Sequence, residues 1–236
     1  MSDTTVRELK LEEMPQAGAL LGRAMRDNPL YVRVAGSDPA RRETVFGSIF
    51  GVLLATLHAK GTVLGAFQDG KLAGVCALVP PGRGEPTGGE KLRLTSAVLA
   101  HVSFGGKFNA LGWLGAWTNP DPQKQSHWHL GPVGVERELQ GQGIDRALIE
   151  AACGRVDAQN GAAYLETDRE ANLPFYESFT FKAAAETKLI GVPNWSMLRP
   201  ARTNAARWSP PPAAGRFVVL PRPERSKPPG PASPDP

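Results

Sequence analysis

A glycine-containing loop that leads from an apolar strand into a helix is the most informative segment of the sequence. It reads Gln140-Gly141-Gln142-Gly143, and the helical pattern begins at Ile144. The first N–H groups of a helix have no partner inside it, and the helix dipole adds about half a positive charge there. Glycines let a phosphate approach the backbone closely. The segment therefore predicts an anion site for a phosphate, with a tight turn that binds nothing as the alternative.

Two common nucleotide motifs do not fit this loop. The Rossmann fingerprint would require a third glycine where Arg146 stands, and the sequence contains no Gly-Lys-Ser/Thr of a P-loop.

Two blocks of the sequence resemble the GNAT superfamily of acyl-CoA-dependent N-acetyltransferases. Residues 140–145 match its Arg/Gln-x-x-Gly-x-Gly/Ala signature except at the last position, which is Asp145. The stretch from Tyr164 to Phe181 is similar to the family's Leu-Glu-Thr and Asn-x-x-Phe-Tyr-x-x-x-Gly-Phe block. Both blocks are similar to those of the puromycin N-acetyltransferase branch. The resemblance is specific over about residues 127–200, and the order of elements agrees from residue 5 onward.

The resemblance implies an α+β fold, in which a mixed, mostly antiparallel sheet carries helices on both faces and splayed strands form an acyl-CoA cleft. The pantetheine arm would lie along one strand and the pyrophosphate on the loop and the first helical turn. Asn172 would contact the cofactor arm, although Asn is also a good helix N-cap. The residues expected to bind acetyl-CoA are Val133, Gly134, Val135, Gln140, Gly141, Gln142, Gly143, Ile144, Asp145, Arg146, Asn172 and Tyr176.

Three residues are candidates for the catalytic chemistry. Tyr176 matches the tyrosine that the family uses as general acid toward the coenzyme A thiolate; packing beside Phe175 and Phe179 is the alternative. His129 and Glu166 are candidates for the base that deprotonates the attacking ammonium. His129 could equally pack as an aromatic side chain. His127 shares its strand face, but no third ligand stands at metal spacing, so no metal is expected.

Two departures from the family pattern put full activity in question. Asp145 replaces Gly or Ala at the end of the signature, and Thr180 replaces the Gly before Phe181, where a left-handed helix exit is expected. A β-branched residue in that conformation costs roughly 1 kcal/mol or more.

The elements that must position these residues follow from hydrophobic periodicity and turn signals. Helices are expected from Pro15 to Asn28-Pro29, over 41–58, 90–102, 108–117 and 144–159, and briefly over 172–179. Strands are expected over 6–11, 62–67, 71–79, 127–135, 162–167, 182–190 and 195–198. Asp69-Gly70 predicts a hairpin turn, and Asn160-Gly161 a left-handed helix stop. We expect one domain over residues 1–202 and a Pro/Arg-rich disordered tail over 203–236.

Composition and charge narrow the function classes. The 236 residues contain 27 Lys and Arg against 23 Asp and Glu, and the whole surplus falls in residues 201–236. A nucleic-acid partner is therefore not expected. The N-terminus has no apolar core of a signal peptide, and the apolar stretch 94–117 contains Lys107, so a cytoplasmic protein without a membrane partner is expected. Two cysteines do not make a disulfide framework.

The resulting functional hypothesis is an acetyl-CoA-dependent N-acetyltransferase, a monomer or homodimer, that acts on a primary amine of a small molecule, antibiotic-like amines included. The alternatives are a protein or peptide N-acetyltransferase and an acyl-CoA-binding regulatory module with little or no catalysis. In the family, residues corresponding to 28–33 and 91–117 select the acceptor. The aromatic residues of the second segment would line a pocket or form a helix core: Phe104, Phe108, Trp113 and Trp117.

Overall fold

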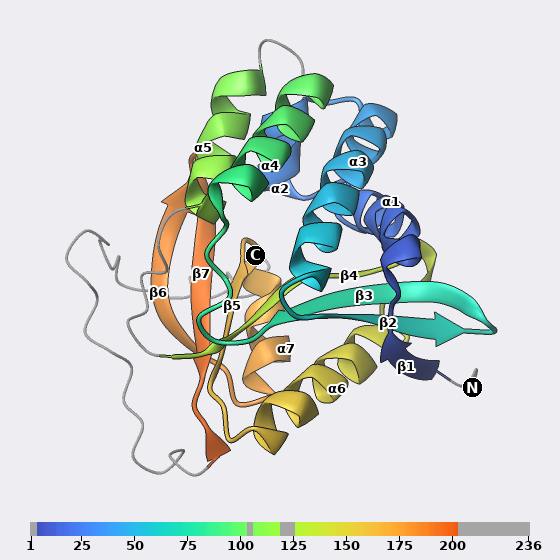
Figure 1. The fold of residues 1–236 in the computed structure, drawn as a ribbon, viewed down its shortest axis with the longest axis vertical. Coiled ribbons are helices and arrows are strands. Elements are labelled where there is room, and N and C mark those ends of the chain that lie inside the picture. The colour runs from blue at the N-terminus through green and yellow to red at the C-terminus, as the bar shows by residue number, and fades with distance from the viewer. Residues whose placement is uncertain (1–3, 103–105, 119–125, 203–236) are drawn as a thin grey trace, which may run out of the picture.

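A seven-stranded sheet forms the centre of the computed structural model, which describes residues 4–102, 106–118 and 126–202 (Figure 1). The strand order is β1-β2-β3-β4-β5-β7-β6. Neighbouring strands are antiparallel except β4 and β5, which run parallel. The strands are β1 (Thr4–Glu8), β2 (Thr62–Gln68), β3 (Lys71–Val79), β4 (Trp128–Val135), β5 (Ala163–Thr167), β6 (Lys182–Leu189) and β7 (Val192–Arg199).

Helices cover both faces of this sheet, which confirms the expected α+β architecture (Figure 1). One face carries α1 (Met14–Ala24), α2 (Pro29–Ala35), α3 (Pro39–His58), α4 (Gly88–His101) and α5 (Lys107–Thr118). The other carries α6 (Ile144–Ala158) and α7 (Leu173–Glu177). Alternate residues of β2 and β3 supply the two cores: Val63 and Val75 pack under the first set of helices, Leu64 and Cys76 under the second. Below, these faces are called the α1–α5 face and the α6–α7 face.

The turn signals in the sequence are confirmed. Asp69 and Gly70, at φ 50° and 74°, connect β2 to β3, with Gln68 opposite Lys71. Both central residues of such a two-residue hairpin need positive φ. Asn160 has φ 48° directly after α6, as the left-handed helix stop requires.

The prediction for the end of the first helix was wrong. We expected that helix to continue to Asn28-Pro29, but α1 ends at Ala24 and these two residues begin α2. The Asn28 side chain caps α2 by accepting a hydrogen bond from the Leu30 N–H at 2.9 Å. Asn at the N-cap followed by Pro at N1 is a start signal, and the same dipeptide also ends a preceding helix. The Asn28-Pro29 dipeptide is compatible with both a helix end and a helix start, and here it starts α2.

The first strand also lies earlier than expected, at residues 4–8 instead of 6–11. The chain leaves the sheet at Leu9, whose N–H donates to Val63 O at 2.8 Å, and a 3₁₀ turn follows over Leu11–Glu13. The Glu13 carboxylate accepts from the Lys10 N–H and pairs with Arg7 at 2.7 Å, which fixes this exit. The strand therefore ends at Glu8, where the contacts of Glu13 turn the chain, although the apolar pattern continues to Leu11.

Close packing of α1 on α3 depends on glycines for which the sequence analysis gave no role. A Cβ on Gly18 would lie 2.4 Å from Gly51 N, and one on Gly22 would lie 2.5 Å from Glu43 O. Real Cβ atoms do not approach backbone atoms this closely. The missing side chains therefore let the two helix backbones touch, and they bring the C-terminal end of α1 down onto β4, where Gly134 faces Leu21 and Ala24.

The predicted tail, residues 203–236, lies outside the described residues, so the domain boundary near residue 202 remains a proposal. Within the described ranges, no helix is long and apolar enough to cross a membrane. Of the apolar stretch 94–117, residues 94–101 belong to α4 and residues 107–117 to α5.

Candidate active site

The sheet opens between β4 and β5. The two strands pair only at Trp128 with Ala163 and at His129 with Tyr164. Immediately afterwards β4 contains the cis peptide Gly131-Pro132, and its register against β3 shifts between Cys76 and Leu78. From there β4 follows β3 and leaves β5 (Figure 1). The edge of β4 that faces β5 is therefore open beyond His129.

The residues expected to hold the pantetheine arm line this open part of β4. Val133, Gly134 and Val135 pair with Cys76, Val75 and Gly74 of β3 on their other edge. An unpaired strand edge presents N–H and C=O groups to any chain-like molecule that lies beside it. A pantetheine arm carries two amides, so the geometry fits the prediction.

The glycine loop has the backbone that an anion site needs. Gly141 and Gly143 have φ 77° and 84°, and a Cβ on either would meet no atom within 4 Å. The space beside these residues is therefore open, and their conformation favours glycine. The Gln140 side chain secures the loop by donating to Val135 O at 3.2 Å.

The first turn of α6 offers backbone N–H groups to a phosphate, and it also carries a carboxylate that competes for one of them. Gly143 is the N-cap, and the helical hydrogen bonds begin with Ala147 N–H to Gly143 O at 3.0 Å. The N–H groups before Ala147 precede this ladder, as they do at every helix N-terminus. One of them, on Arg146, already donates to the Asp145 carboxylate at 2.9 Å. The loop therefore fits a pyrophosphate, except that Asp145 places a carboxylate and one occupied amide beside it.

Tyr176 packs on the α6–α7 face of the sheet, in the same core cluster as Leu130 of β4 and Leu165 of β5, and is 8% exposed. Its ring packs against Phe175 and Phe181, with centroid distances of 5.2 and 6.1 Å. Burial raises the pKa of its hydroxyl, and the negative charges of Asp145 and Asp168 add to the effect. The hydroxyl therefore stays protonated across the physiological range and can act only as a donor to an anion. Its ring packs, as the alternative interpretation held, and its chemistry still suits the predicted acid.

The two candidate bases lie together on the α1–α5 side of the sheet. The rings of His129 and Tyr164 meet edge to face at 5.4 Å, and the Tyr164 hydroxyl donates to Glu166 at 2.6 Å. His127, 9% exposed, approaches the same tyrosine ring at 5.0 Å. His129 therefore does pack on an aromatic ring, but it is also exposed, as Glu166 is. Packing and a catalytic role are compatible here.

The candidate acid and the candidate bases thus lie on opposite faces of one opening. Leu165 packs in the same core cluster as Tyr176, whereas its strand neighbours Tyr164 and Glu166 point to the other face. An acceptor that approaches from the α1–α5 face would meet the bases first. A leaving thiolate on the far side would meet Tyr176.

Asn172 does not cap α7 with its side chain. It occupies the N-cap position, but its amide donates to Thr167 Oγ1 at 3.0 Å instead. This bond ties the turn before α7 to the end of β5. The capping interpretation is therefore wrong, and contact with the cofactor arm stays a prediction.

Thr180 adopts the left-handed conformation expected from the family pattern, with φ 68°. The turn is held by Thr180 N–H to Glu177 O at 2.9 Å and Phe181 N–H to Tyr176 O at 3.3 Å. We expect Thr180→Gly to stabilise the protein. Release of left-handed strain gives roughly 1–2 kcal/mol, and the greater freedom of glycine in the unfolded chain removes about 0.4–1 kcal/mol of it.

Urea unfolding measures this change, and Ser178→Gly is its matched control. Ser178 lies two residues earlier with a right-handed helical φ of −62°. Glycine there should destabilise by roughly 0.5–1 kcal/mol. The same sign for both variants would show that Thr180 is not strained.

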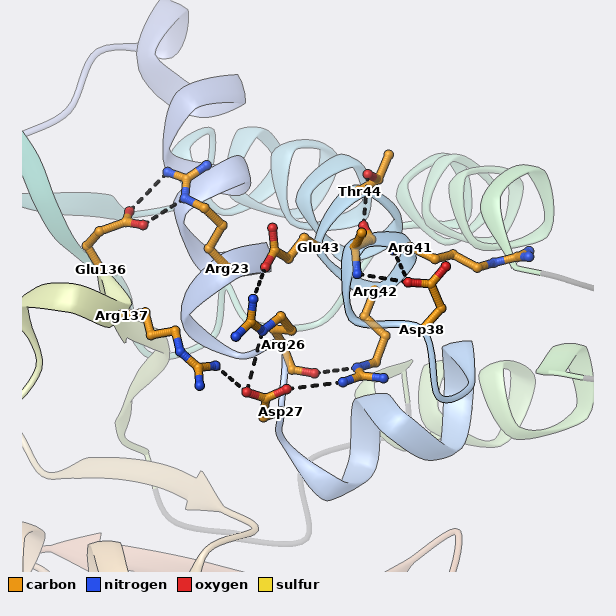
Figure 2. Close-up of polar contacts among 11 residues, drawn as sticks. Arg23, Arg26, Asp27, Asp38, Arg41, Arg42, Glu43, Thr44, Glu136 and Arg137 are labelled. Carbon is orange, nitrogen blue, oxygen red and sulfur yellow. Dashed lines mark hydrogen bonds and ion pairs between the residues drawn. The ribbon is translucent and has the colours of Figure 1, made fainter.

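A network of arginines and carboxylates fixes the start of the glycine loop to the α1–α5 face (Figure 2). Glu136, which follows β4, pairs with Arg23 of α1 at 2.7 and 3.0 Å. Arg137 pairs with Asp27, which also accepts from Arg42 of α3 at 3.1 Å. The pairs Arg23–Glu136 and Arg137–Asp27 could not be seen in the sequence, because their members lie more than 100 residues apart.

Arg42 is the buried member of this network, at 4% exposure. Besides Asp27, it donates to Arg26 O at 2.5 Å (Figure 2). It also donates to Gly36 O at 2.8 Å, so its two carbonyl partners lie on either side of α2. The guanidinium therefore holds the chain segment that enters and leaves α2. This segment overlaps residues 28–33, which the resemblance connects with the acceptor.

Of the four aromatic residues proposed for an acceptor pocket or a helix core, the structure describes the side chain of one, Trp113. Trp113 is 2% exposed and packs edge to face against Tyr31 and Phe46, at 5.9 and 5.6 Å, so it belongs to the helix core. Phe104 and the side chains of Phe108 and Trp117 lie outside the described parts. Over the same described residues, no group of three His, Cys, Asp or Glu side chains is arranged to hold a metal ion.

The comparisons with known proteins agree with this geometry. The chain has the fold of a Corynebacterium glutamicum structure described as histone acetyltransferase HPA2 and related acetyltransferase: the TM-score is 0.65 at 20% identity, over 85% of this chain and 97% of that one. A Drosophila melanogaster polyamine N-acetyltransferase gives a TM-score of 0.51 at 14% identity, over 83% of this chain and 99% of that one.

These structures define the class by fold: an acetyltransferase-type α+β sheet that opens between two parallel strands. Residues 90–181 match the model of the Acetyltransferase (GNAT) family. This part of the chain therefore has the sequence pattern of a GNAT acetyltransferase domain, in agreement with the resemblance and with the fold. Membership of the puromycin N-acetyltransferase branch stays a prediction.

Proposed function

We propose that this protein transfers the acetyl group of acetyl-CoA to a primary amine of a small molecule. The observation that carries the proposal is the opening between β4 and β5, which has the glycine loop at one end, Tyr176 on one side and Glu166 with His129 on the other. Bound acetyl-CoA would supply the thioester. The amine would attack it directly.

The residues of this chain would divide the proton transfers between them. Glu166 or His129 would accept the proton of the incoming ammonium on the α1–α5 face. Tyr176 would donate to the thiolate that leaves on the α6–α7 face. The hydrogen bond from Tyr164 to Glu166 fixes one carboxylate oxygen and leaves the other for the amine. General acid–base groups of this kind typically contribute 10²–10⁴-fold each.

A binding module without catalysis is the alternative that a specific observation favours. The Asp145 carboxylate already accepts one of the first N–H groups of α6, which weakens the expected phosphate site. Tyr176 and Glu166 are not needed for such a role.

Thermal unfolding with acetyl-CoA tests the cofactor half of the proposal. A ligand at 100 times its dissociation constant stabilises the native state by about 2.7 kcal/mol. We expect acetyl-CoA and coenzyme A to raise the melting temperature. Dephospho-coenzyme A should do so as well, because it keeps the pyrophosphate that the loop is proposed to bind. No shift with any of the three would refute the proposal.

A further inference from the structure

A partly buried carboxylate that forms no salt bridge with any of the described residues lies at the end of β5. Asp168 directly follows the strand, beyond the last residue that pairs with β4. Its Oδ1 accepts a hydrogen bond from the Asn28 amide at 2.8 Å. Of the salt bridges formed by the described residues, none includes Asp168. A half-buried charge is unfavourable unless a cation or sufficient hydrogen bonds compensate it.

Asp168 lies on the same face of the sheet as the candidate bases, and its charge also reaches the candidate acid Tyr176. Its partner Asn28 begins α2, so the carboxylate faces the α1–α5 side, where Glu166 and His129 also lie. Burial is the main reason why the pKa values of Tyr31 and Tyr176 are raised, and the charge of Asp168 contributes to both. The carboxylate therefore lies within electrostatic reach of the proposed general acid and of the buried aromatic cluster under α2.

The protein holds Asp168 in place through a chain of contacts that begins at the glycine loop. Arg137 and Arg42 both bind Asp27 (Figure 2), and Asn28 is the next residue. Asn28 is fixed a second time, because its Oδ1 caps α2 while its Nδ2 binds Asp168. An amide that donates to a carboxylate leaves the negative charge unneutralised. The arrangement thus orients the carboxylate and keeps it available for a cation.

We propose that Asp168 binds the ammonium group of the acceptor, so that the acceptor is a cationic amine held on the α1–α5 face of the opening. The inference rests on the proposed acetyl transfer and specifies its substrate. Glu166 or His129 would then accept the proton from an ammonium that Asp168 has oriented. Burial raises the pKa of Asp168, against the opposing effects of Asn28 and Arg169.

Binding of simple amines to the full chain saturated with coenzyme A tests the inference. The cationic probes are butylamine, phenethylamine and 1,4-diaminobutane, and aniline is a comparator that is uncharged at neutral pH. Asp168→Asn keeps an oxygen for Asn28 and removes the charge. We expect it to weaken binding of the cationic probes roughly ten- to hundredfold, as for loss of a charge-assisted hydrogen bond. Aniline binding and the acetyl-CoA dissociation constant should be unchanged.

Glu170→Gln is the matched control. It removes the same charge from an exposed residue of the same turn and should change binding less than twofold. Equal affinities of wild type and Asp168→Asn for the cationic probes would overturn the inference, as would a wild type that binds none of them. The two proposals can also fail separately. If Asp168→Asn loses binding of the cationic probes but the wild type acetylates none of them, the ammonium site is supported and the proposed enzymatic activity is refuted.

Discussion

Tyr176→Phe should lower turnover by roughly 10²–10⁴-fold, the usual loss when a general acid is removed. The ring would keep its contacts with Phe175 and Phe181, so the free energy of unfolding should change little. The hydroxyl would be lost from the side of the opening where the thiolate is proposed to leave. Steady-state kinetics with the best acceptor of an amine panel measures the effect.

Acetyl-CoA binding by the same variant separates chemistry from packing. The dissociation constant should remain within about threefold of wild type, since the pyrophosphate and pantetheine are proposed to bind backbone groups. Wild-type turnover in the phenylalanine variant would show that Tyr176 only packs. A parallel loss of stability and turnover would assign it a structural role.

Asp145→Gly should tighten acetyl-CoA binding. The carboxylate lies at the first turn of α6, where it occupies the Arg146 N–H. Two unit charges about 5 Å apart repel by roughly 3 kcal/mol at an effective dielectric of 20, and salt reduces this. Glycine also removes a favourable dipole interaction of roughly 0.3–1 kcal/mol from the helix. The net expectation is an affinity gain between several-fold and about thirtyfold.

Asp145→Asn divides this gain into its two causes. Asparagine removes the charge but keeps an oxygen that can accept from the Arg146 N–H. If repulsion dominates, both variants should bind more tightly, and the gain should shrink as salt rises. If the occupied amide dominates, only the glycine variant should gain. Equal affinities of all three proteins in calorimetric titration would show that Asp145 does not affect the ligand.

The elements with strong local signals could be predicted from the sequence. The hairpin at Asp69-Gly70, the helix stop at Asn160 and the left-handed residue Thr180 are set by the conformational needs of single positions. The glycine loop could be predicted for the same reason. The helix over Pro29–Ala35 was missed because Asn-Pro both ends and starts helices, and its tertiary contacts decide which.

The polar framework of the site could not be predicted. Asn28 and Asp168 are 140 residues apart, and Arg23 and Glu136 are 113 apart. Such pairs form because the sheet order brings β4 and β5 beneath α1 and α2, which no local pattern encodes. The close approach of α1 to α3 on glycines is of the same kind, since each glycine is meaningful only opposite its partner backbone.

Release of coenzyme A thiol from acetyl-CoA in the presence of an amine panel tests the central claim most directly. We expect acetyl-CoA-dependent thiol release with at least one primary amine. An equal amount of the acetylated amine should appear in the mass spectrum, and Tyr176→Phe should be strongly impaired in both. A protein that binds acetyl-CoA tightly but releases no thiol with any amine would contradict the account and identify the fold as a binding module.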